Sequence, residues 1–211
     1  MTLSEPLSAI ALNCSLKPSS AEEPSSTDRM IALIADHLAR EDVSLAETIR
    51  VADHDVKPGV LSDEGPGDAW PALREKVLTA DILIFAGPIW LGQPSSIAKR
   101  VLERMDAFLG EADHEGRYPP YGKVAVVGVV GNEDGAHHVA AESFQALSDV
   151  GWTIPPMGSC YWVGEAMHPT DFKDLGEVPT PIATTARSLA ANAAHVARLL
   201  KQESYPAPGD P

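Results

Sequence analysis

Short apolar runs alternate along the chain with segments in which apolar residues recur at helical spacing, five of each. Two of the runs, 81–87 and 124–130, are almost continuously apolar, as expected of parallel strands covered on both faces. Alternating strands and helices are joined by right-handed crossovers, which place helices on both faces of one sheet. The pattern therefore predicts an α/β three-layer sandwich built on a five-stranded parallel sheet.

The boundaries of these elements follow from the apolar pattern and from residues that begin or end helices. The predicted strands are Ala9–Cys14, Leu45–Val51, Asp81–Gly87, Val124–Val130 and Thr153–Val163. The predicted helices are Thr27–Ala39, a short helix capped by Asp68 that ends at Leu78, Ile97–Leu109, Val139–Val150 and Ile182–Lys201. Five such units support the flavodoxin-like strand order 2-1-3-4-5.

The length and composition favour one domain. The 211 residues are 44% hydrophobic and 22% charged, as in an ordinary globular protein. We expect residues 1–211 to form a single domain with a disordered tail from about residue 203. No signal peptide and no apolar run of ~20 residues is present, which predicts a cytoplasmic protein with no membrane partner. Cys14 and Cys160 are expected to be buried, reduced thiols.

The charge of the chain limits its partners. The formal net charge is −14 and the basic residues are scattered, whereas a nucleic-acid surface needs a basic stripe. Nucleic acid is therefore not an expected partner. An anionic ligand would have to be held locally, by backbone N–H groups and hydroxyls.

In a sheet of this order, ligands bind at the carboxyl ends of the strands, where the first and third strands diverge. The loop after the first strand concentrates hydroxyls at the start of a helix, and its candidate phosphate ligands are Ser15, Lys17, Ser26 and Thr27. The alternative is that Ser26 or Thr27 only caps the helix. The P-loop and GxGxxG fingerprints are both absent.

The loops after the third and fourth strands complete the expected site. The third strand is followed by GPIWLGQPSS, in which Pro and Gly predict an irregular turn without regular backbone pairing. Trp90 in this loop either packs against a planar ligand or covers the edge of the core. The fourth strand is followed by GNEDGAHH, where small and polar residues allow close approach of a ligand.

No metal site is expected. His137 and His138 are adjacent and point in different directions on a helix, which makes them a poor metal pair. The segment Asp53–Asp55 is interpreted as an acidic surface loop. Its loop has no cysteine, which excludes an iron–sulfur cluster there.

The segment GPIWLGQPSSIAKRVLERMDAF resembles the pattern G-P-x-[YW]-x-G-x-x-S-x-x-[LA]-K-x-x-x-[ED]-R of the NADPH-dependent FMN reductase family of flavodoxin-like proteins. The hydroxyl-rich first loop and the glycine loop at 131–135 support the resemblance. The first loop departs from the family's compact G-S-x-R form, because it is longer and Asn13 replaces Gly. The resemblance implies FMN as cofactor, and its phosphate would be held chiefly by Ser15, Ser26 and Thr27, near Lys17. Its ring would be lined by Pro88, Ile89, Trp90, Leu91 and Gly92 on one side and flanked by Gly131, Asn132, Asp134 and Gly135 on the other.

The function implied is an FMN-dependent oxidoreductase that takes hydride from NAD(P)H and passes it to a small-molecule acceptor such as a quinone or a flavin. The flavin carries the chemistry, so no catalytic acid or base is named. The alternative is a flavodoxin-type one-electron carrier, in which aromatic residues from two loops commonly enclose the flavin. The loop at 131–136 has no aromatic residue, although Tyr161 or Trp162 could fold back over the site. A phosphoacceptor receiver domain would need acidic residues where this chain has 13–15 as Asn-Cys-Ser. The resemblance also implies a homodimer or tetramer.

Overall fold

A computed structural model describes residues 6–207. Five parallel strands form one sheet in the order β2-β1-β3-β5-β6. Their bounds are β1 Leu7–Asn13, β2 Val43–Arg50, β3 Ile82–Trp90, β5 Val124–Gly131 and β6 Ser159–Val163. With the two-residue strand β4 (Gln93–Pro94) set aside, this is the predicted order 2-1-3-4-5.

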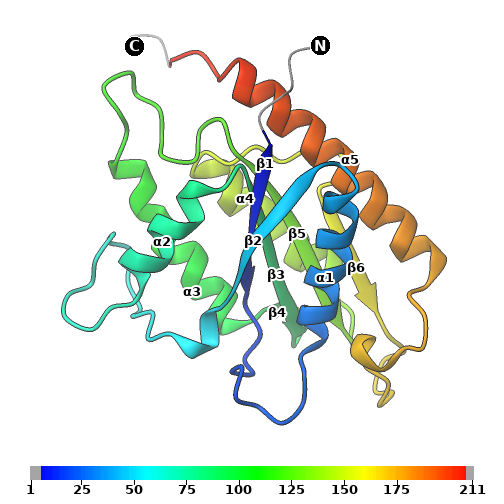
Figure 1. The fold of residues 1–211 in the computed structure, drawn as a ribbon. Helices are drawn as coiled ribbons and strands as arrows, with labels where there is room; N and C mark the ends of the chain where they lie inside the picture. The colour runs from blue at the N-terminus through cyan, green and yellow to red at the C-terminus, as the bar shows by residue number, and fades with distance from the viewer. Residues whose placement is uncertain (1–5, 208–211) are drawn as a thin grey trace.

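Helices cover both faces of this sheet (Figure 1), which confirms the predicted three-layer sandwich. Helices α1 (Ser26–Ala39) and α5 (Thr180–Gln202) lie on one face, and their apolar sides meet the sheet in one buried cluster. The helices on the other face pack in a second cluster and are α2 Trp70–Thr79, α3 Ser96–Met105 and α4 Ala136–Asp149. Short 3₁₀ turns follow β2, α3 and β6 at η1 Val51–Asp53, η2 Asp106–Gly110 and η3 Phe172–Asp174.

The centre of the sheet is apolar on both faces, as the sequence pattern requires. Every residue of β5 except the last is buried. A Cβ atom at Gly128 would lie 3.0 Å from the side chain of Met30 and 3.1 Å from that of Ala86. The missing side chain at this position lets α1 pack directly on the middle of the sheet.

The third strand differs from the prediction because it continues past Gly87 to Trp90. Its end pairs antiparallel with β4, in the register Ile89 with Pro94 and Trp90 with Gln93. The intervening Leu91 and Gly92 have φ values of 53° and 72°, as in the tight two-residue turns that suit hairpins. The expected irregular turn is therefore wrong: the segment is a regular hairpin that projects from the carboxyl edge of the sheet.

The start of α2 also differs from the prediction, because Ala69 and not Asp68 is the N-cap residue. The Asp68 carboxylate is completely buried and pairs with Arg104 of α3, the Oδ2 to Nη2 distance being 2.7 Å. Arg104 also donates to the carbonyl oxygens of Lys57 and Leu61. This buried pair holds the long loop between η1 and α2 against the body of the protein.

Part of the tail expected to be disordered contacts the body of the protein. The Tyr205 hydroxyl lies 3.0 Å from Thr153 Oγ1, and its ring packs edge-on against Tyr121. Residues 208–211 lie outside the described residues.

Candidate functional site

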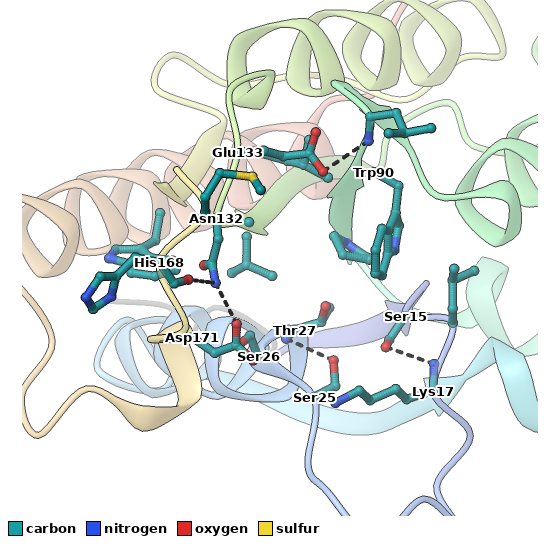
Figure 2. A pocket seen from close by; sticks show the side chains of 18 residues that line it. Ser15, Lys17, Ser25, Ser26, Thr27, Trp90, Asn132, Glu133, His168 and Asp171 are labelled. Carbon is teal, nitrogen blue, oxygen red and sulfur yellow. Dashed lines mark hydrogen bonds between the residues drawn. The ribbon is translucent and has the colours of Figure 1, made fainter. Parts of the chain in front are cut away.

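A cavity of about 560 Å³ opens at the carboxyl ends of the central strands (Figure 2), the position that the strand order predicts. Its volume lies within the range of about 300–1,000 Å³ that is usual for small-molecule sites. It is lined by residues of the loop after β1, the hairpin, the loop after β5, and the segment after β6. Hydroxyl groups gather at one end of the cavity, and aromatic and acidic side chains gather at the other.

The hydroxyl end is built on the start of α1. Ser25 is the N-cap residue: its Oγ accepts from the N–H of Thr27 at 3.1 Å. Asp28 completes a capping box by accepting from the N–H of Ser25 at 3.1 Å, and it also binds Arg50 and Asn13. The alternative that Ser26 or Thr27 caps the helix is therefore wrong, since Ser25 performs that role. The Ser26 and Thr27 side chains remain at the cavity.

Hydroxyl groups at this end have hydrogen-bonding capacity to offer a ligand. Thr27 is 1% exposed, and its Oγ1 has no hydrogen-bond partner among the described residues. Ser15 Oγ accepts from Lys17 N at 3.1 Å and Ser26 Oγ accepts from Lys173 N at 3.1 Å. Each of these two hydroxyls keeps its own O–H as a donor. Such donors at a positive helix N-terminus fit a phosphate group.

Two lysines lie beside the hydroxyl end. Lys17 lines the cavity and pairs with Glu23 at 3.3 Å. Lys173 Nζ pairs with Asp174 at 3.0 Å and with Asp171 at 3.7 Å, and the hydrogen bond to Asp174 raises the pKa of Lys173. A phosphate bound at this end would lie near Lys17 and Lys173, both of which already form ion pairs with carboxylates.

The aromatic end has one wall from the hairpin and one from β6. Trp90 is 52% exposed and its ring lies along the cavity in Figure 2. Trp162, by contrast, is buried and packs against Phe172, with ring centroids 5.5 Å apart. Tyr161 does not line the cavity, and its hydroxyl contacts His137 at 2.8 Å. Of the two aromatic residues that could fold back, Trp162 is the one that reaches the cavity.

The segment after β6, Gly164–Leu175, crosses this edge of the protein, and we refer to it as the strap. Asn132 Nδ2 donates to Asp171 Oδ1 at 2.9 Å and to the carbonyl oxygen of His168 at 3.2 Å (Figure 2). Arg29 of α1 donates to three strap carbonyl oxygens and lies over the ring of Phe172. The strap is thereby attached to α1 and to the loop after β5, both of which border the cavity.

The structure brings most of the predicted site residues together around this cavity. Those that line it are Ser15, Lys17, Ser26, Thr27, Pro88, Ile89, Trp90, Leu91, Gly131 and Asn132. Three of the predicted residues do not line it: Gly92, Asp134 and Gly135. Asp134 is exposed, and its carboxylate accepts from the N–H of Gly135.

Sequence reasoning missed a second group of lining residues: Leu16, Ser25, Val130, Glu133, Met167, His168 and Asp171. Trp162 also lines the cavity and was anticipated only as a residue that could fold back over the site. Ser25 and Glu133 lie inside loops that the sequence pattern already indicates as part of the site. The strap residues were missed because only the loops after the first, third and fourth strands were considered. The fifth strand also ends at this edge, so the same rule, applied to it, would have found them.

The remaining titratable groups do not indicate a metal or thiol site. Among residues 6–207, no group of three or more His, Cys, Asp or Glu side chains is arranged to hold a metal ion. Cys14 and Cys160 are both buried and unpaired with one another. Burial raises the pKa of Cys160 to about 12 and that of Cys14 still further. No helix within residues 6–207 is long and apolar enough to cross a membrane.

Known proteins resemble this chain along nearly its whole length. A curated Mycobacterium bovis protein described as the divalent metal cation transporter MntH is 37% identical over 202 residues, covering 92% of this chain. This chain spans only 29% of that relative's length. The 8-demethyl-8-aminoriboflavin-5'-phosphate synthase of Streptomyces davaonensis is 33% identical over 214 residues, covering 94% of this chain and 80% of the relative.

Solved structures agree with the fold. A crystal structure of RosB with bound 8-demethyl-8-formylriboflavin-5'-phosphate superposes with a TM-score of 0.85, at 32% identity over 94% of this chain and 82% of that one. The NADH:FMN oxidoreductase EMOB has a TM-score of 0.58 at 22% identity, over 92% of this chain and 89% of that one, which supports the fold alone. The family described as NADPH-dependent FMN reductase matches residues 8–168. The chain thus belongs to the NADPH-dependent FMN reductase family.

Proposed function

We propose that this protein is an FMN-dependent NAD(P)H oxidoreductase that reduces a small-molecule acceptor. The observation that carries the proposal is the buried, unpartnered Thr27 Oγ1 at the start of α1, beside Ser15 and Ser26 in the cavity. An unsatisfied buried hydroxyl is costly unless a ligand completes its hydrogen bonds. The family match supports FMN as that ligand.

Each end of the cavity has a separate part in this proposal. Thr27, Ser15 and Ser26 would donate to the phosphate of FMN, and the dipole of α1 would favour its negative charge. Trp90 and the backbone of the hairpin would lie against the ring system. When bound, FMN accepts hydride from a nicotinamide and passes the electrons on.

The rim of the cavity supports a proposal for the class of acceptor. Three lining side chains there are apolar and exposed: Leu91 is 89% exposed, Met167 99% and Leu16 44%. These side chains and Trp90 give the solvent-exposed part of the cavity lining an apolar character, which suits a planar, weakly polar molecule such as a quinone or a second flavin. Such an exposed apolar rim also suits contact with a second subunit, so we expect a homodimer or tetramer. A monomer by light scattering would contradict that expectation.

A second candidate function is chemistry on the flavin itself. It is favoured by the similarity to the Streptomyces synthase and to the RosB structure, which holds a formylated flavin phosphate. The two functions differ in the mass of the flavin recovered after turnover. Unchanged FMN supports the reductase, whereas FMN altered at its ring supports the second candidate.

The proposed phosphate-binding site at the start of α1 is tested by comparing FMN with riboflavin, which lacks the phosphate. In a Thr27→Val variant, FMN should bind about 10- to 100-fold more weakly, since a hydrogen bond to a charged group is lost, and riboflavin should bind as in the wild type. Thr79→Val is the control, because Thr79 lies at the opposite edge of the sheet and its Oγ1 donates only to Lys76 O. Calorimetric titration measures both ligands. Equal loss for FMN and riboflavin would place the phosphate elsewhere.

A further inference from the structure

The tip of the hairpin presents two neighbouring backbone N–H groups. Leu91 and Gly92 both have positive φ, so their N–H groups point to the same side of the turn. Leucine rarely adopts this conformation, because its Cβ atom approaches its own backbone. The turn therefore depends on contacts outside the hairpin to stay in this shape.

Glu133, in the loop after β5, supplies those contacts. Its Oε1 accepts from the N–H of Leu91 at 3.0 Å, and its Oε2 accepts from the N–H of Gly92 at 2.9 Å. Both carboxylate oxygens are thus used in one bidentate contact across two loops. Hydrogen bonds to an ionised acceptor are about twice as strong as neutral ones.

A second contact between the same loops is steric. A Cβ atom at Gly135 would lie 2.8 Å from both the Cα and the carbonyl oxygen of Gly92. The loop after β5 therefore lies directly against the backbone of the turn. The loop after β5 thus holds the hairpin in two ways, through the Glu133 carboxylate and through backbone contact at Gly135.

Trp90 directly precedes this turn and forms the hairpin wall of the cavity. About half of its surface is exposed, so packing covers only part of this side chain. We propose that Glu133 is a positioning residue: by holding the turn of Leu91 and Gly92, it keeps Trp90 against the cavity and so sets the affinity for a planar ring. This inference rests on the proposed function in taking FMN as the ligand.

The test also distinguishes the opposite effect, in which Glu133 weakens the binding of a planar ring. A ligand edge with a carbonyl oxygen could also use the two N–H groups, in which case the carboxylate would compete with it. The two effects have opposite signs: removal of the carboxylate weakens ring binding if Glu133 positions the wall and strengthens it if Glu133 competes.

The test compares Glu133→Gln with the wild type. Glutamine keeps the length of the side chain but offers one acceptor oxygen, so it can satisfy only one of the two N–H groups. The control is Glu47→Gln, on β2, where the carboxylate pairs with Lys76 of α2 and does not touch the hairpin. Thermal melting of both variants checks that the fold is retained.

The first readout needs no flavin. Hydrogen exchange of the Leu91 and Gly92 amides should be at least about 10-fold faster in Glu133→Gln than in the wild type or the control, since one charge-assisted pair is lost. Unchanged exchange at both amides would overturn the proposal. Because this readout does not depend on FMN, it stands even if the proposed function fails.

The second readout is affinity for FMN and for riboflavin, measured by titration. Glu133→Gln should weaken both by the same factor, about 10-fold, because the wall contacts the ring that they share. Tighter binding of both, or a loss confined to FMN, would overturn the proposal. A wild type that binds neither flavin would instead contradict the proposed function. The hydrogen-exchange result would then test only whether Glu133 holds the turn of Leu91 and Gly92.

Discussion

Replacement of Arg104 by Met should be among the most destabilising single changes in this protein. Arg104 and Asp68 form a completely buried ion pair, and the guanidinium also donates to the carbonyl oxygens of Lys57 and Leu61. Methionine fills similar space but leaves the Asp68 charge without a countercharge. Breaking one side of a buried pair costs about 3–5 kcal/mol. In a protein of this size that corresponds to a fall in Tm of roughly 6–20 °C.

The control for this prediction is another arginine ion pair, on the surface. Arg117 pairs with Asp113 and Glu115, all of them partly exposed. Exposed pairs contribute about 0–1 kcal/mol, so Arg117→Met should change little. Urea unfolding followed by tryptophan fluorescence measures both variants. Equal losses in the two variants would refute the argument that burial makes the Arg104 pair important.

The same pair predicts sensitivity to acid. Burial alone would raise the pKa of Asp68, but hydrogen bonds from Arg104 and from the N–H groups of Glu64, Trp70 and Lys57 hold this pKa well below its ordinary value. The stability that the lowered pKa provides is present above the ordinary Asp pKa of about 3.9 and is lost as the pH falls below it. In Arg104→Met the pKa of Asp68 in the folded protein rises toward its unfolded value, so less stability should be lost as the pH falls below about 3.9. A loss in the variant as large as in the wild type, measured by urea unfolding across this pH range, would contradict this account.

Three further predictions concern the site and the thiols. Gly135→Ala should lower the Tm and weaken flavin binding, because the added Cβ atom would meet the Gly92 backbone and because φ at Gly135 is 129°. Phe172→Ala should cost about 3–5 kcal/mol of unfolding free energy in a denaturant titration, since this fully buried side chain supports the strap. Cys14 and Cys160 should resist alkylation by iodoacetamide at pH 8 in the native protein, because burial raises both thiol pKa values, and should react on unfolding. Rapid native labelling, measured by mass spectrometry, would contradict their burial.

The alternation of apolar runs and helical patterns was sufficient to predict the sheet and its strand order. Runs such as 124–130 leave few options, because a continuously apolar strand must be covered on both faces. The strand order then placed the site at one edge of the sheet. Ten of the predicted site residues line one cavity for this reason.

The features that the sequence predicted wrongly or missed depend on contacts between segments distant in sequence. Asp68 has the local signature of an N-cap, but its partner is Arg104, 36 positions further along the chain, and the buried pair decides its role. Glu133 looked like a polar loop residue, and only the hairpin shows what its carboxylate binds. The strap has no apolar periodicity of its own, and the contacts of Arg29 with its carbonyl oxygens and with Phe172 hold it at the cavity.

The most direct test of the central claim is anaerobic titration of the FMN-loaded protein with NADH and with NADPH, followed by visible absorbance. The account predicts that at least one nucleotide bleaches the bound flavin and that a quinone added afterwards restores the oxidised spectrum. Bound flavin that neither nucleotide reduces would contradict the reductase and favour a one-electron carrier. A protein that does not retain FMN at all would contradict the proposed site as well.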